Sequence, residues 1–274
     1  MVYRRHGLGV RIVYLLIACV AHVFSGLGRR FAGRWLVLCY HGVCDTHASR
    51  FREQMRHLSR SASRDAGGNE HCVSRRSLPD VHITFDDAFE NLMRNALPAL
   101  HEFGIPAVVF AVSGNLGKTP QWRISPDHPE YGERLMTAGQ LREIANGCVV
   151  IGSHTQTHPS LTELSREQVR TELAESRKCL EETLGRPVVD LALPHGAYND
   201  AVLEVAREVG YKRIYTLQPR VHGAQENGDV VGRFSMSPDV WPIEFRLTCA
   251  GAYAWLGPWR RCARAIRRWA FGNR

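Results

Sequence analysis

Residues 81–112 read VHITFDDAFENLMRNALPALHEFGIPAVVFAV, and this stretch decides the class of fold. It opens with a β-rich run, 81–85, that leads directly into Asp86 and Asp87. Apolar residues then recur at helical spacing over 89–103, Gly104 ends the expected helix, and 107–112 is a second β-rich run. A strand, a helix and a strand in this order predict a βαβ unit with two parallel strands in one sheet.

The same alternation extends to both sides of this stretch. Further strands are expected at residues 35–40, 149–151, 188–193 and 212–216, and further helices at 51–58, 138–145, 166–184 and 201–209. Residues 60–77 are rich in Ser, Gly and Arg and are expected to form a loop. The sequence therefore predicts an α/β fold with a parallel sheet, either open or closed into a barrel.

Charge divides the 274 residues into three parts. Residues 1–35 contain six Arg and no acidic residue, and residues 256–274 contain another six Arg and no acidic residue. All 27 acidic residues lie between these ends, where they outnumber the 23 basic ones. A mildly acidic body argues against a nucleic-acid-binding domain. We expect a basic N-terminal segment (1–34), a catalytic domain (35–255) and a basic C-terminal helix (256–274).

The two ends have the composition of membrane-surface helices. Residues 10–24 are apolar except for Arg11 and His22, a run too short to span a bilayer comfortably. In residues 256–274, Trp and aliphatic residues recur at helical spacing, with Arg largely on the other side. We expect peripheral attachment to an anionic bacterial inner membrane. Alternatives are that both helices only pack on the domain, or that a signal peptide or a lipoprotein cleavage before Cys19 exports the protein.

The eight cysteines favour the cytoplasmic side of that membrane. No two of them have the C-x-x-C spacing, and no cluster of them suggests a zinc site. Scattered thiols fit a reducing compartment better than a disulfide framework.

Polar residues follow several of the expected strands, at the end where parallel α/β folds build their sites. They are His41, the pair Asp86 and Asp87, His154 and His195. Two adjacent buried carboxylates favour a nearby cation, although they could also serve as the N-terminal acids of the following helix. His41 could contact substrate or a reacting water, or it could close a turn onto the backbone.

His154 and His158 are the sharper metal signal. At positions i and i+4 they would lie on one side of a helical turn and could share one metal ion, although they could equally be two His of a polar loop. With one Asp they would form a three-ligand site with an open position, which is typical of catalytic metal centres. The remaining Asp would then be free to act as a base.

Three motifs together resemble the polysaccharide deacetylases of carbohydrate esterase family 4, the NodB-homology domains. They are Thr84-Phe85-Asp86-Asp87, the segment Ser153 to Pro159 (SHTQTHP), and the segment Leu193 to Tyr198 (LPHGAY). Residues 39–43, CYHGV, resemble the first strand of one branch of that family. The resemblance covers about residues 35–255 and implies an irregular (β/α)7 barrel. It also implies an enzyme that removes N-acetyl groups from amino sugars of a bacterial surface polysaccharide or exopolysaccharide, or of its lipid-linked precursor.

The resemblance implies a role for each matched residue. Asp86 would be the catalytic base, and Asp87, His154 and His158 would bind one divalent metal, zinc first, with cobalt or nickel also suited to these ligands. The residues implied to line the substrate groove, together with the strand-end His41, are Pro194, His195 and Tyr198.

The sequence also departs from the family pattern. No Arg stands near the third motif to orient the base, His195 replaces an aromatic residue, and Ala88 replaces a Gly, a change expected to be harmless. No late Leu-x-x-His supplies a general acid, which leaves Asp86, His222 or His41 as candidates. These departures keep open an alternative: a glycan-binding protein that retains the deacetylase fold but has lost turnover.

Overall fold

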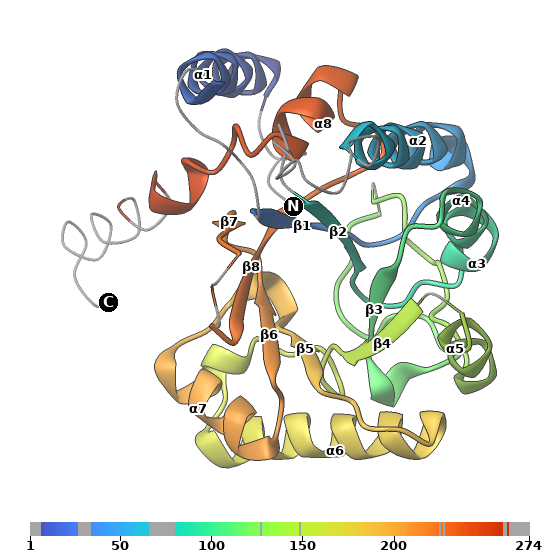
Figure 1. The fold of residues 1–274 in the computed structure, drawn as a ribbon. Coiled ribbons are helices and arrows are strands. Elements are labelled where there is room, and N and C mark those ends of the chain that lie inside the picture. The colour runs from blue at the N-terminus through green and yellow to red at the C-terminus, as the bar shows by residue number, and fades with distance from the viewer. Residues whose placement is uncertain are drawn as a thin grey trace, which may run out of the picture.

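The computed structural model describes residues 7–26, 34–65, 80–259 and 262, apart from positions 127, 148, 225 and 227. Within these residues, seven parallel strands form a closed barrel with helices around its outside (Figure 1). The order around the barrel is β2-β3-β4-β5-β6-β8-β1, and the pairing of β1 with β2 closes it. The expected (β/α)7 barrel is thus confirmed. Its strands are β1 (Trp35–Tyr40), β2 (Asp80–Phe85), β3 (Ala107–Ala111), β4 (Val149–Ser153), β5 (Asp190–Ala192), β6 (Arg213–Thr216) and β8 (Val230–Ser235).

The barrel has two layers of core. The larger one lies between the strands and the surrounding helices and includes Leu36 and Leu38 of β1. Successive side chains of a strand point to opposite faces, so the intervening Val37 points into the barrel. It joins a small interior cluster with Phe110, Ala192, Tyr215 and Val231. This apolar cluster fills the interior of the barrel below the polar residues that follow the strands.

The helices begin and end where local chemistry predicts. α5 (Ala138–Ala145) starts with a reciprocal cap in which the Thr137 hydroxyl accepts from the Gln140 amide and the Gln140 side chain accepts from the Thr137 amide. α6 (Arg166–Leu184) has the same cap at Ser165 and ends at Gly185, whose φ of 67° suits glycine. Three further helices are α2 (Ala48–Asp65), α7 (Asp200–Val209) and α8 (Pro242–Cys249).

Two local expectations were wrong. The helix expected over 89–103 is two short helices, α3 (Leu92–Asn95) and α4 (Leu97–Phe103), separated at Ala96. Pro98 explains the break, because it lacks an amide donor and its ring clashes with a preceding helical carbonyl. The loop expected from residue 60 begins later, since α2 continues to Asp65. Residues 66–79 lie outside the described part of the chain.

Two strands near the C-terminal end were not expected from the pattern. β8 closes the barrel between β6 and β1, and the short β7 (Val221–His222) pairs antiparallel with the start of β1. β7 therefore lies at the end of the barrel where the strands begin, opposite the polar strand ends.

The terminal segments are described in part. α1 (Leu8–Gly26) is a helix that packs beside α8, while the expected C-terminal helix lies mostly outside the described residues. Among the described helices, none is long and apolar enough to cross a membrane. The described cysteines, at positions 19, 39, 44, 179, 249 and 262, are free thiols.

Candidate active site

The two carboxylates of Asp86 and Asp87 emerge at the end of β2 through a strained turn. The Asp86 amide still donates to the Tyr40 carbonyl at 2.9 Å, which continues the pairing with β1. Asp87 and Ala88 then adopt left-handed backbone conformations, with φ of 70° and 57°. For residues with a Cβ this costs about 1 kcal/mol each, so Ala88 is a strained replacement for the family's glycine. The turn places both carboxylates along the same cavity at this end of the barrel.

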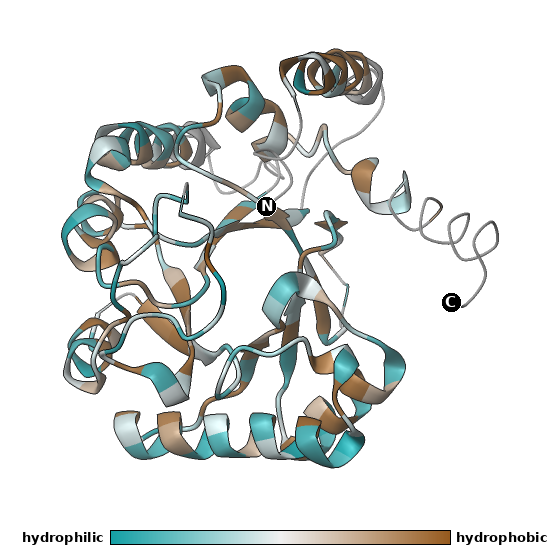
Figure 2. Ribbon diagram, turned by 180° about the vertical axis from the view of Figure 1, so that it is seen from behind, coloured by the Kyte–Doolittle hydropathy of each residue, from teal (hydrophilic) through white to brown (hydrophobic). Residues whose placement is uncertain are grey.

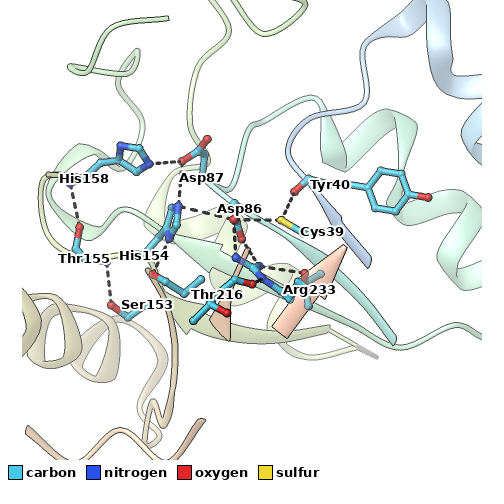
Figure 3. A network of polar contacts seen from close by, with 12 residues as sticks. Cys39, Tyr40, Asp86, Asp87, Ser153, His154, Thr155, His158, Thr216 and Arg233 are labelled. Carbon is cyan, nitrogen blue, oxygen red and sulfur yellow. Dashed lines mark hydrogen bonds and ion pairs between the residues drawn. The ribbon is translucent and has the colours of Figure 1, made fainter. Parts of the chain in front are cut away.

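Asp86 is held by a fully buried arginine from β8. The Arg233 guanidinium donates to both Asp86 oxygens, from Nη1 at 2.6 Å and from Nη2 at 2.9 Å (Figure 3). The Cys39 thiol adds a third donor at 3.2 Å. Burial alone would raise the pKa of Asp86, but the charge and hydrogen bonds of Arg233 hold that pKa well below its usual range. Asp86 is therefore an ionised carboxylate of fixed orientation.

Arg233 supplies what the third motif lacks. The sequence has no arginine near the third motif, and in the structure the arginine that binds Asp86 comes from a different strand. Its guanidinium lies 5.3 Å from the centre of the Phe110 ring and 5.7 Å from that of Tyr215, inside the barrel. The signal in the sequence was a single Arg within the otherwise β-rich run 230–235, VVGRFS.

Asp87, His154 and His158 bring three potential metal ligands together. One ligand atom from each lies within 4.8 Å of the others, and all three residues are buried. Asp87 Oδ1 is 3.6 Å from His154 Nε2 and 3.4 Å from His158 Nε2 (Figure 3). Among the described residues, Asp87 Oδ1 has no hydrogen-bond partner. A buried carboxylate oxygen facing two imidazole nitrogens fits a divalent cation.

The protonation of this group also suits a cation. The His154 Nδ1 is 2.8 Å from the Ala192 carbonyl, which can only accept, so Nδ1 carries the proton and the Nε2 lone pair faces Asp87. Burial, with the neighbouring His154 and His195, lowers the pKa of His158 to about 2, so its imidazole is neutral. Burial and the charge of Asp86 raise the pKa of Asp87, a cost that a bound cation would offset.

The loop that carries the two histidines is not the helical turn expected from their spacing. His154 directly follows β4, and the next four residues form an irregular loop. Thr155 and His158 are both left-handed, with φ of 67° and 66°, and this returns His158 toward His154. The Glu172 carboxylate of α6 accepts from the Gln156 and Thr157 amides and so fixes the loop from outside.

A cavity of about 680 Å³ opens over these side chains. Its lining includes His41 and His195 together with Asp86, Asp87, His154 and His158. Burial lowers the pKa of His41 to about 4, so this imidazole is neutral at neutral pH. His195 is exposed and stands edge-on to His158, with ring centres 4.8 Å apart. The structure therefore brings both histidines to the expected site.

The other two residues expected to line the substrate groove do not line this cavity. Pro194 is buried, and Tyr198 is half-buried against the main core. Their role in substrate binding stays a prediction. His222 is far from the cavity: it pairs with Trp35 at the start of β1, and its ring stacks on Trp35 at 4.2 Å. It therefore cannot reach a group bound above Asp86.

A long loop after β3 forms a wall that the sequence did not indicate. Trp122 stacks on the His158 ring with centres 4.3 Å apart. This aromatic contact fixes the plane of a predicted metal ligand. Other cavity-lining residues from the loop are Arg123, Ile124, Ser125 and His128. No periodicity places them near the site, since the loop has neither helical nor strand spacing.

The polysaccharide deacetylase family model matches residues 74–214, about half of the chain. The chain belongs to the polysaccharide deacetylase family.

Individual relatives are distant. A chitooligosaccharide deacetylase of Rhizobium leguminosarum bv. trifolii is 25% identical over 143 residues, covering 52% of this chain and 58% of that protein. A poly-beta-1,6-N-acetyl-D-glucosamine N-deacetylase of Staphylococcus aureus is 24% identical over 170 residues, covering 59% of this chain and 56% of that protein. The matches thus span little more than half of these curated relatives.

Solved structures show the same fold. IcaB from Ammonifex degensii superposes with a TM-score of 0.60 at 24% identity, covering 80% of this chain and 97% of that one. The Streptococcus pyogenes deacetylase PplD, solved in complex with acetate, gives a TM-score of 0.60 at 20% identity and covers 79% of this chain and 98% of that one.

Proposed function

We propose that the protein is a metal-dependent hydrolase that removes N-acetyl groups from the amino sugars of a bacterial glycan. The observation that carries this proposal is the placement of two adjacent carboxylates in opposite environments: Asp86 is bound by Arg233, while Asp87 faces His154 and His158. A base and a metal site thus stand side by side at the floor of one cavity. The names of the two curated relatives support an N-acetylated glycan as the substrate class.

The metal site consists of Asp87, His154 and His158, one carboxylate and two imidazoles. This donor set suits zinc and also cobalt or nickel. When bound, the ion supplies Lewis acidity, which polarises the acetyl carbonyl and makes a water molecule easier to deprotonate. The Ala192 carbonyl at His154 and the Trp122 ring at His158 hold the two imidazoles in place for this role.

Asp86 acts as the general base. It takes a proton from the attacking water as the water oxygen bonds to the acetyl carbon, and Arg233 holds the carboxylate in position throughout. The bond between that carbon and the sugar nitrogen then breaks, which yields acetate and a free amine. The leaving nitrogen must receive a proton.

His41 is the residue that we assign to this proton. It lines the same cavity as Asp86, and its neutral imidazole can receive the proton from the base and pass it to the nitrogen. His222 cannot take this role because it stacks on Trp35 at the opposite end of the barrel. The lack of a late Leu-x-x-His therefore does not leave the site without a proton donor.

The alternative of a fold-retaining protein without turnover loses its main support. It rested on two missing groups, and we assign one role to Arg233, which binds Asp86, and the other to His41, which lines the same cavity.

Amine release from chitooligosaccharides and from poly-β-1,6-N-acetylglucosamine oligomers tests the proposal. The protein is first stripped with a chelator and then assayed with and without added zinc, next to Asp86→Asn. We expect zinc-dependent amine release by the wild type and none above background by Asp86→Asn. Equal background release by both proteins on every glycan would refute the deacetylase assignment.

A further inference from the structure

One side of helix α1 packs against α8 and the residues next to it. Arg11 forms an ion pair of 2.7 Å with Glu244 and lies 4.6 Å from the centre of the Trp241 ring. One turn further along, Tyr14 meets Trp255 edge-to-face at 5.5 Å. Ala18 is completely buried. These contacts recur at helical spacing, so α1 lies along α8 and the turn after it with a fixed face inward.

The opposite side of α1 is aliphatic and open to water. In Figure 2 the helix, beside α8 at the edge of the molecule, is coloured largely as hydrophobic. Leu16 is 60% exposed and Val20 is 55% exposed. Of the twelve large hydrophobic side chains that are exposed in the described residues, eight belong to this helix. They are Leu8, Val10, Ile12, Val13, Leu16, Ile17, Val20 and Val23, and we call them the α1 outer face.

The α1 outer face is too large and too uniform to be an ordinary surface. Its members extend from the first to the last described turns of the helix, and none carries a charge or a hydrogen-bonding group. Contiguous apolar surface of this kind marks a contact with a membrane or a partner. Protein interfaces surround such a core with polar groups that fix the orientation of the partner, whereas a bilayer requires no such groups.

The charges in the sequence around α1 point to an anionic bilayer. Arg4 and Arg5 precede the helix, Arg29 and Arg30 follow it, and no acidic residue occurs before Asp45. Each Arg near an anionic leaflet contributes about 1 kcal/mol of attraction.

An exposed tryptophan follows, one turn further along the chain, the residue that contacts this helix. Trp259 is 59% exposed, and its amide donates to the carbonyl of Trp255, the residue that meets Tyr14. Tryptophan is enriched where protein meets the lipid headgroups.

We propose that the α1 outer face docks the protein on the surface of an anionic lipid bilayer. The helix lies in the plane of the lipid headgroups, with its inner face kept on α8. Arg11 of this helix lines a small cavity together with His41 and Glu130, so the docked helix lies beside the catalytic end of the barrel. If the proposed function holds, its substrate is then a glycan carried at the membrane, such as a lipid-linked amino sugar.

Flotation of the full-length protein with vesicles tests the docking. The vesicles are phosphatidylcholine alone or phosphatidylcholine with about one third phosphatidylglycerol. We compare the wild type with the double variant Leu16→Glu/Val20→Glu. A matched control is Lys178→Glu, which changes the net charge by the same amount on the exposed surface of α6, on the far side of the barrel from α1 (Figure 1).

The wild type and Lys178→Glu are expected to float with the anionic vesicles. The partition coefficient of the double variant should fall roughly a hundred-fold, because two aliphatic side chains no longer enter the bilayer. Thermal melting checks that each variant is folded. Equal flotation of the double variant and the wild type would overturn the proposal. A wild type that does not float with the anionic vesicles would overturn it too.

Light scattering in the absence of lipid tests whether the α1 outer face binds a second copy of the chain instead of a bilayer. A dimer of the wild type that the double variant abolishes would assign the α1 outer face to a second copy of the chain and would overturn the proposal. Flotation does not depend on catalysis, so its outcome is independent of the amine-release assay.

Discussion

Asp86 and Asp87 are neighbours in the chain and are both buried, yet their surroundings shift their pKa values in opposite directions. Asp86 accepts two hydrogen bonds from Arg233 and one from the Cys39 thiol, and its pKa is lowered. Asp87 has an oxygen without a partner among the described residues, and its pKa is raised. The difference supports the proposal that the chain itself neutralises one carboxylate, whereas a bound cation neutralises the other. Substitutions that disrupt the surroundings of Asp86 should therefore have different effects from substitutions that disrupt the surroundings of Asp87.

The largest expected effect is on stability and comes from removing the partner of Asp86. Arg233→Met leaves a buried carboxylate without its cation, which should lower the free energy of unfolding at neutral pH by about 3–5 kcal/mol. Guanidinium-induced unfolding measures this. Since the folded pKa of Asp86 is lowered in the wild type, the pair stabilises that protein at neutral pH, and this stability is lost as the pH falls below about 4. In the variant, burial without Arg233 raises the pKa of Asp86, so the difference between the two proteins should begin to shrink already as the pH falls from neutral.

A double variant sharpens this prediction. In the Arg233→Met background, Asp86→Asn removes the unpaired charge and should recover part of the lost stability. If the two substitutions were simply additive, the ion pair would not be what holds Asp86.

The next effect compares His41, which we assign as the proton donor, with His222, which stacks on Trp35 at the opposite end of the barrel. His41→Asn should lower the rate of amine release on the order of a hundred-fold, because the leaving nitrogen loses its proton donor. His222→Asn should leave the rate within about two-fold, since that ring lies at the other end of the barrel. Rates are compared per folded protein. The reverse ranking would remove His41 from the mechanism.

The smallest effect tests the environment of the predicted metal ligands. Trp122→Ala removes the ring that stacks on His158 and should raise the zinc dissociation constant about ten-fold. Trp122→Phe keeps an aromatic face and serves as the control. Competition with a zinc-binding dye measures both, and an unchanged constant in the Ala variant would show that the stacking does not orient the ligand.

The sequence predicted the site residues that follow expected strands, because the ends of parallel strands converge. Asp86 and Asp87 after β2 and His154 after β4 were found in this way. Arg233 was missed because it lies 147 residues from Asp86, and only the closure of the barrel brings β8 next to β1. No spacing rule connects residues across such a closure.

Local geometry was harder to predict than placement. The i, i+4 spacing of His154 and His158 suggested a helical turn, but two left-handed residues bring the rings together instead. Such conformations are uncommon for non-glycine residues. Their cost is offset by contacts such as the hydrogen bond that the Glu172 carboxylate accepts from the Gln156 amide, and these contacts come from outside the loop. Pro98, in contrast, was a readable signal for the break between α3 and α4.

The metal content of Asp86→Asn and Asp87→Asn, measured side by side after purification in zinc, tests the central claim most directly. The two variants carry the same isosteric change one residue apart. We predict that Asp86→Asn retains about one zinc per chain and is inactive. We predict that Asp87→Asn loses the metal, as His154→Ala and His158→Ala should. Loss of zinc from Asp86→Asn alone, or equal zinc in both variants, would contradict the division between base and ligand.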